Sequence, residues 1–303
     1  MKRLFTALLF FAPLGAWAQA KNAAKDTTAA RDLLLVPMRI IAQHNGDSII
    51  VRWAPGNAVI WLLSQQEGFV FRRRVFTKSN KNVFTLVDSS SVIIHPWTLD
   101  EWAAYFKSSG DSLSAIAAQV SYGKTLAFDN GEQGNSINSI FEKYNEQQNR
   151  YGFALLLSDF DPKVAEGLGL RFVDRQVKKE LYYLYTVRPA ATRPDLHSDT
   201  GRVLIGGAEV YSRKKLPAVS AVAGDRVIHL FWAANDPADH YSGYIIERSE
   251  DGKHFVPLNR LPYISFHKEE GMLKPVRYDD SVAMDYKKYY YRVSGINAFG
   301  GRS

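Results

Sequence analysis

Histidine is the residue type in this sequence best suited to metal binding and to acid–base catalysis near neutral pH. The seven histidines are His44, His95, His197, His229, His240, His254 and His267. None lies in a His-Glu-x-x-His arrangement or in another short metal-ligand spacing. Asp236, Asp239 and His240 cluster after Trp232, but a polar cluster of this kind is typical of a solvated turn. We therefore expect no metal site.

Acidic residues that are close in sequence give no indication of a catalytic pair. Asp159 and Asp161 are two positions apart, whereas a glycosidase needs two carboxylates that face each other across a cleft. Asp161 precedes a proline and is better explained as a helix cap. The segment Asp129-Asn130-Gly131-Glu132 has residues typical of calcium loops without their ligand spacing, which favours a plain turn.

Other signatures of catalysis are also missing from the sequence. It contains no Gly-x-Ser-x-Gly elbow and no phosphate-binding glycine loop. It contains no cysteine, which excludes thiol nucleophiles, cysteine-based zinc sites, disulfides and an acylated-cysteine anchor. We therefore predict a protein that is not an enzyme, with no catalytic residues and no cofactor.

The formal charge of the chain is +7, of which Lys2 and Arg3 contribute two units. The other basic residues are scattered, with small clusters at Arg72-Arg73-Arg74 and Arg213-Lys214-Lys215. A nucleic-acid footprint needs a concentrated basic stripe and a recognisable reading element, and the sequence shows neither. The charge predicts solubility and a weak affinity for polyanions, and no nucleic-acid partner.

The N-terminus has the pattern of an export signal. Lys2 and Arg3 precede an apolar run over 4–14, and Ala16-Trp17-Ala18 supplies the small residues that a signal peptidase reads. We expect a signal peptide over 1–18 and a flexible, polar leader over 19–32. No second long apolar stretch follows, so we expect no transmembrane segment in the mature chain, which would be secreted, periplasmic or associated with the cell surface.

Two distant parts of the chain repeat one pattern of short segments. The repeat indicates the strands that hold the rest of the chain in place. The matching segments are 48–53 with 227–232, 68–73 with 243–248, 171–174 with 277–280, and 183–187 with 289–293. From Arg73 to Arg171 there are 98 positions but from Arg248 to Arg277 only 29, which indicates an insertion of 69 residues in the first copy. Each segment is rich in Val, Ile, Phe, Tyr and Trp between turn residues, as in short strands.

The second copy resembles a fibronectin type III domain. Phe231-Trp232, the run 243–249 with Asp251-Gly252, and the run 289–293 are similar to that family's second, third and sixth strands. The resemblance implies tandem immunoglobulin-like β-sandwiches, over 33–213 with an α-helical insertion at about 92–170, and over 214–303. It also implies that the second module lacks its last strand, because the chain stops just after the sixth.

The resemblance assigns structural roles to four aromatic residues. Trp53 and Trp232 are expected in the core between two sheets, and Tyr183 and Tyr289 are expected to hydrogen-bond back to the backbone near the sixth strand.

The insertion has the signals of a small helical subdomain. Thr98 and Glu101 form a capping-box pattern, Ser112 is a candidate cap for a second helix, and a third helix is expected from about 135 to 150. Asp161-Pro162 predicts a short last helix that ends near Gly167.

Aromatic residues of the insertion are the candidate binding residues. The aromatic residues form either a sugar-stacking platform or partner patch, or the core of the subdomain, which short helices need for stability. They are Trp97, Trp102, Tyr105 and Phe106. The resemblance to type III modules implies that loops and the helical insertion are presented to a partner. We predict an exported, non-catalytic binding or scaffolding protein of the cell envelope or exterior, with an unidentified protein or polysaccharide partner. One alternative is the non-catalytic N-terminal region of a secreted hydrolase whose catalytic domain lies beyond residue 303. The other is a polysaccharide-binding protein.

Overall fold

The computed structural model describes residues 35–123, 137–191, 193, 197–212, 216, 218–233, 241–264 and 275–303. Several predictions concern segments outside these ranges. They are the signal peptide, the leader, the basic cluster 213–215, the turn 129–132, and the cluster of Asp236, Asp239 and His240.

Two antiparallel sheets form the N-terminal sheet pair, and they face each other across one core. The first has the order β2-β3-β6, from β2 (Met38–His44), β3 (Ile49–Pro55) and β6 (Arg171–Asp174). The second has the order β5-β4-β7-β9, from β4 (Phe69–Lys78), β5 (Phe84–Ile94), β7 (Tyr182–Pro189) and β9 (Gly201–Gly206). Two short strands, β1 (Leu35–Val36) and β8 (His197–Ser198), pair in parallel beside them.

The C-terminal sheet pair repeats this plan with one strand fewer. Its first sheet has the order β10-β11-β14, from β10 (Ser220–Gly224), β11 (Val227–Trp232) and β14 (Val276–Asp280). Its second has the order β13-β12-β15, from β12 (Tyr241–Ser249), β13 (Val256–Pro257) and β15 (Tyr290–Asn297). After β15, Arg302 makes an isolated bridge to Ile296. The prediction of a mainly β chain is confirmed, in the form of several open antiparallel sheets.

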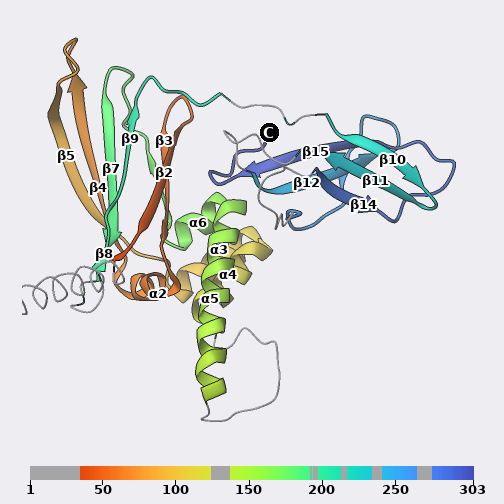
Figure 1. Cartoon of the computed structure of the whole chain (residues 1–303), viewed down its shortest axis with the longest axis horizontal. Coiled ribbons are helices and arrows are strands. Elements are labelled where there is room, and N and C mark those ends of the chain that lie inside the picture. The colour runs from red at the N-terminus through yellow and green to blue at the C-terminus, as the bar shows by residue number, and fades with distance from the viewer. Residues whose placement is uncertain are drawn as a thin grey trace, which may run out of the picture.

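Four helices lie between the two sheet pairs (Figure 1), in the insertion that separates β5 from β6. They are α3 (Leu99–Ser109), α4 (Ser112–Tyr122), α5 (Ile137–Phe160) and α6 (Pro162–Gly167). The predicted capping box is confirmed, since the Thr98 and Glu101 side chains each accept a hydrogen bond from the other residue's backbone N–H. Asp161 caps α6 as predicted. No helix in the described part of the chain is long and apolar enough to cross a bilayer.

Two helix predictions need correction, and one helix was not predicted. Asp111, and not Ser112, caps α4, because its carboxylate accepts from the N–H groups of Leu113 and Ser114. Helix α5 continues ten residues past Arg150, because Ala154 and Leu157 extend its buried face. An unpredicted helix, α2 (Ala58–Glu67), joins β3 to β4.

Each sheet pair encloses its own core, and one tryptophan occupies the corresponding place in each. Trp53 on β3 and Trp232 on β11 are both 2% exposed. The Trp53 ring meets Phe69 of β4 edge to face at 5.9 Å, and the Trp232 ring meets Tyr244 of β12 in the same way at 5.2 Å. The N-terminal core also takes in buried residues of the insertion, such as Trp102 and Leu157. The helices are therefore part of the N-terminal core.

In each sheet pair, a buried aspartate lies at the end of one strand and accepts hydrogen bonds from residues of the facing sheet. Asp174, at the end of β6, accepts hydrogen bonds from Arg73 Nε (2.6 Å) and from the Tyr185 hydroxyl (2.7 Å). Asp280, at the end of β14, accepts from Arg248 Nη1 (2.9 Å) and the Tyr291 hydroxyl (2.8 Å). Burial, and then the bond to the carboxylate, raise the pKa of both tyrosines.

A second tyrosine lies two residues before Tyr185 of β7 and two residues before Tyr291 of β15. Its hydroxyl accepts a hydrogen bond from the loop that precedes the strand. The Tyr183 hydroxyl accepts a hydrogen bond from the backbone N–H of Lys178 (2.7 Å), and the Tyr289 hydroxyl accepts one from Met284 (3.3 Å). The guanidinium of Arg73 lies 5.2 Å from the Tyr183 ring centre, and that of Arg248 lies 4.8 Å from the Tyr289 ring centre. The two sheet pairs thus share a four-residue network of Arg, Asp and two Tyr.

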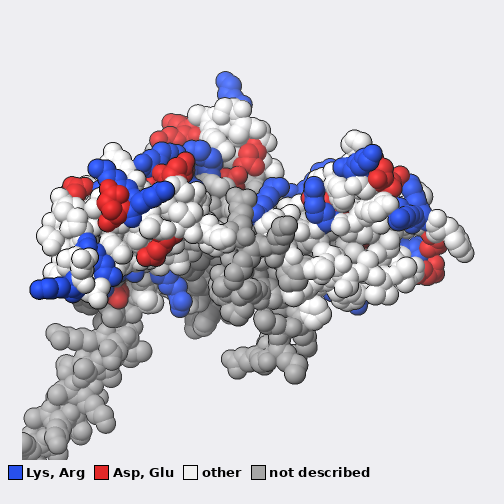
Figure 2. Space-filling view, turned by 90° about the horizontal axis from the view of Figure 1, so that it is seen from above, with Lys and Arg blue, Asp and Glu red and all other residues white. Residues whose placement is uncertain are grey.

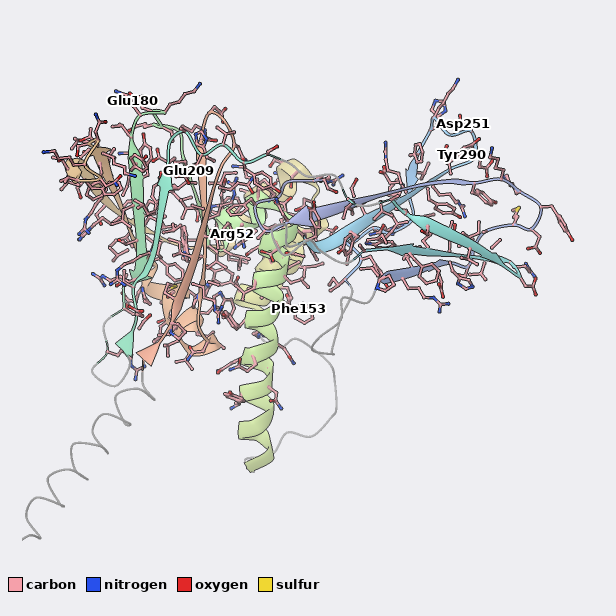
Figure 3. The ribbon with its side chains drawn as sticks, turned by 45° about the horizontal axis from the view of Figure 1, so that its top comes forward. Arg52, Phe153, Glu180, Glu209, Asp251 and Tyr290 are labelled. Carbon is pink, nitrogen blue, oxygen red and sulfur yellow. The ribbon has the colours of Figure 1, made fainter. Side chains whose placement is uncertain are left out.

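Arg52 joins the two sheet pairs through the insertion (Figure 3). Its guanidinium donates to the backbone oxygens of Ser158 on α5 and Ala298 after β15, and it pairs with Asp159 at 3.0 Å. The other carboxylate oxygen of Asp159 accepts from the Ser242 hydroxyl of β12 (2.7 Å). Burial lowers the pKa of Arg52, and Asp159 acts in the opposite direction.

We expect Asp280→Asn to lower the free energy of unfolding by about 1.5–3 kcal/mol, because a charge-assisted bond between the facing sheets is lost. Tyr291→Phe should lower the free energy of unfolding by about 1 kcal/mol. The double variant should lose less than the sum of the two single losses, because both changes remove the same hydrogen bond. Urea unfolding followed by circular dichroism measures these values. Tyr290→Phe, on the opposite face of β15, is the matched control and should change stability by less than about 0.5 kcal/mol. Additive losses in the double variant would contradict the shared bond.

Candidate functional site: an arginine face on the N-terminal sheet

Strand alternation divides the basic cluster of β4 between two faces of its sheet. Phe71, Arg73 and Val75 point toward the facing sheet, where Arg73 reaches Asp174. Arg72 and Arg74 point to the opposite, outer face. The run Arg72-Arg73-Arg74, which looks like one cluster in sequence, therefore supplies one structural residue and two surface charges.

The pairing register brings two more arginines to this outer face. Arg72 lies opposite Thr186 of β7, and Thr186 lies opposite Arg202 of β9. Arg188 of β7 lies opposite Val70 of β4, one step along the same face. These residues line a hollow of about 220 Å³ together with Thr200, which precedes β9. We call this surface, formed by Arg72, Arg74, Arg188, Arg202, Thr186 and Thr200, the arginine face.

Positive charge on the arginine face is only weakly balanced. Within the described ranges, Arg72 and Arg74 have no ion-pair partner. Arg188 donates to the backbone oxygen of Pro189 (3.0 Å). Arg202 lies 3.7 Å from a carboxylate oxygen of Asp199, but both side chains are half exposed or more, so this pair contributes little. By contrast, Figure 2 shows basic and acidic side chains interspersed over the described surface that it presents.

The chemistry available here is anion binding. A guanidinium offers paired N–H donors that match a carboxylate, sulfate or phosphate group, and the two threonine hydroxyls add further donors. The lining contains no histidine and no carboxylate that would serve as an acid or base. It also contains no aromatic side chain for stacking bases or sugar rings.

The predicted binding residues Trp97 and Tyr105 lie in the insertion and not on the arginine face. The Trp97 ring centre lies 4.9 Å from that of the buried Trp102 and 5.3 Å from that of Tyr105. The backbone N–H of Trp97 donates to the Gly167 backbone oxygen. Both rings are half-buried. Burial, and then the nearby carboxylate of Asp161, raise the pKa of Tyr105. The two rings are held by packing, with part of each open to solvent.

Two histidines of the C-terminal sheet pair lie within hydrogen-bond distance of aspartates at the surface. His229 Nδ1 lies 2.9 Å from Asp279, and the same carboxylate accepts from Arg277 (2.8 Å). The Arg277 bond, and then the His229 contact, lower the pKa of Asp279 to about 2. His254 similarly contacts Asp251 at 2.6 Å. Over the described residues there is no group of three or more His, Asp or Glu side chains that would hold a metal ion.

Sequence reasoning missed the arginine face, although it noted two of its residues. Arg188 and Arg202 are isolated in sequence, and only the register of β7 between β4 and β9 places them beside Arg72. The alternation of β4 is a signal that would have separated Arg73 from its two neighbours.

The comparisons with known proteins add no relative. No model of a known protein family matches the sequence, and a search of curated proteins finds no significant match.

We expect the chain to be retained on immobilised heparin at low salt, and to be released as the ionic strength rises past roughly 0.15 M, where the Debye length is about 8 Å. Arg72→Ser/Arg74→Ser should weaken binding about ten- to a hundredfold, because two charge-assisted contacts are lost. The control is Arg260→Ser/Arg302→Ser, which removes the same charge from exposed positions of the C-terminal sheet pair. Equal weakening by both double variants would show that only net charge matters.

Proposed function

We propose that this chain is an exported, non-catalytic binding and scaffolding protein of the cell envelope or exterior, and that it binds an acidic polysaccharide through the arginine face. The observation that carries the proposal is the group of four arginines on one sheet face, two of which have no ion-pair partner among the described residues. A folded protein does not need such like charges side by side, because they repel each other.

Both sheet pairs are, in this proposal, fibronectin type III-like modules. The repeated strand order supports the proposal. In the N-terminal sheet pair a three-stranded sheet faces the sheet that contains β4 and β7, and in the C-terminal pair a three-stranded sheet faces the one that contains β12 and β15. The equivalent settings of Trp53 and Trp232, and the repeated Arg–Asp–Tyr network, support it further. This architecture hosts many functions, so it does not itself name a ligand.

Export rests on the sequence alone. The basic start, the apolar run over 4–14 and the small residues before position 19 have the order of a secretory signal. Acidic polysaccharides are accessible partners for a protein located outside the cytoplasm.

Three features of the site favour an acidic polysaccharide over other anions. The face is open and spans three strands, so it fits a linear polymer that lies across the sheet. Its donors are guanidinium groups and hydroxyls, which match carboxylate and sugar hydroxyl groups. A single-stranded nucleic acid would require stacking aromatics among the basic residues, and the lining contains only Val, Thr and Arg.

Binding measured by calorimetry on polygalacturonate, dextran sulfate, neutral dextran and poly-glutamate tests the proposal. We expect binding to polygalacturonate that is lost in Arg72→Ser/Arg74→Ser and is kept in Arg260→Ser/Arg302→Ser, and no binding to neutral dextran. Affinity for polygalacturonate should fall as the pH drops through about 4, because the ligand carboxylates become protonated while arginine stays charged. Dextran sulfate should show no such loss.

Several outcomes would overturn the proposal. Hydrolysis of any of these polymers by the purified chain would contradict the non-catalytic assignment. Tight binding of poly-glutamate alone would identify an acidic protein as the partner class. Binding that is lost in Trp97→Ala and kept in Arg72→Ser/Arg74→Ser would move the site to the aromatic cluster of the insertion.

A further inference from the structure

Strand β5 forms an open edge of the four-stranded sheet, and almost all of it is exposed. It pairs with β4 on one side, and its other side has no strand partner among the described residues. Every residue from Phe84 to Ile93 is exposed, and the large apolar ones among them are 41–52% exposed. Figure 1 shows β5 at the outer limit of the N-terminal sheet pair, on the side away from the helices.

Such an edge normally carries devices that prevent pairing with another chain. Lysine, proline and inward-pointing charges are common ones, but β5 contains neither lysine nor proline. Its one charged residue, Asp88, lies opposite the inward-pointing Val75 and is neutralised by an ion pair with Arg73 at 2.8 Å, so it does not present a free charge to a second strand. A bulge at Val87 is the remaining irregularity, because Val75 lies opposite Asp88 while Phe76 lies opposite Leu86.

The residue pattern of β5 is complementary to itself when two copies run antiparallel about Ser89. With Val87 counted as the bulged residue, Phe84 lies opposite Ile93 and Val83 lies opposite Ile94, so apolar residues meet at both ends. Near the centre Asp88 lies opposite Ser90, and the two copies of Ser89 lie opposite each other. No like charges are opposed, whereas a register centred on Asp88 would oppose two carboxylates.

We propose that a second copy of this chain pairs with β5 in this register and forms a continuous eight-stranded sheet. Identical residues that oppose each other point to the same side of a sheet, so the two-fold axis is perpendicular to it. The arginine faces of both copies then lie on one side. Arg72 lies opposite Ser91 on β5, one strand from the contact, so the two basic surfaces are neighbours. The pairing itself does not depend on the anionic ligand.

Cysteine cross-linking tests the register, since the chain has no cysteine of its own. Ser89→Cys should form a disulfide-linked dimer under mild oxidation, because directly opposed residues lie within disulfide reach. Thr85→Cys alone should not, since the two copies would be on the order of 20 Å apart along the strands. An equimolar mixture of Thr85→Cys and Val92→Cys should cross-link, because these positions oppose each other. Cross-linking of Thr85→Cys to itself, or none for Ser89→Cys, would overturn the register.

Sedimentation velocity over a range of concentrations tests the dimer without cross-linking. The wild-type chain should reach twice its own mass, and Ser89→Lys should weaken association by at least about tenfold, because two ammonium groups face each other. Ser89→Glu should do the same, and a mixture of the two variants should restore the dimer. Ser89 is exposed, so neither change disturbs the core. A wild-type chain that stays at its own mass, or variants that associate as the wild type does, would overturn the proposal.

Discussion

The structure of each sheet pair depends on one buried carboxylate. Asp174 and Asp280 lie at the ends of β6 and β14, and each is bound by an arginine and a tyrosine from the facing sheet. A buried carboxylate is costly unless its oxygens accept several hydrogen bonds, so these partners must reach it simultaneously. That requirement fixes which residues of β4, β7, β12 and β15 point inward. It therefore fixes which point outward, including Arg72 and Arg74.

The repeat in the sequence was enough to predict much of this arrangement. Aligning Arg73 with Arg248 and Asp174 with Asp280 predicted strands that the structure contains. The prediction succeeds because short β-branched and aromatic runs between turn residues are typical of strands. The capping box of α3 and the Asp-Pro start of α6 were predictable for a similar reason. Their hydrogen bonds are local, so nearby residues determine them.

Features that depend on distant contacts were not predictable in this way. Helix α2 follows β3, which ends at Pro55, and its apolar first half resembles a strand in composition. The Asn57 side chain caps its first turn. Helix α5 continues past its predicted end because Ala154 and Leu157, beyond Arg150, are buried in the N-terminal core. The arginine face needs the register of three strands, which no short motif in the sequence reports.

The shared carboxylate of Asp159 has a mechanical consequence. One of its oxygens binds Arg52 of the N-terminal sheet pair and the other binds Ser242 of the C-terminal pair, so the end of α5 acts as a splint between them. A force applied to one sheet pair is transmitted to the other through the end of α5 as well as along the chain that joins them. We therefore expect the two sheet pairs to move together under load and not independently.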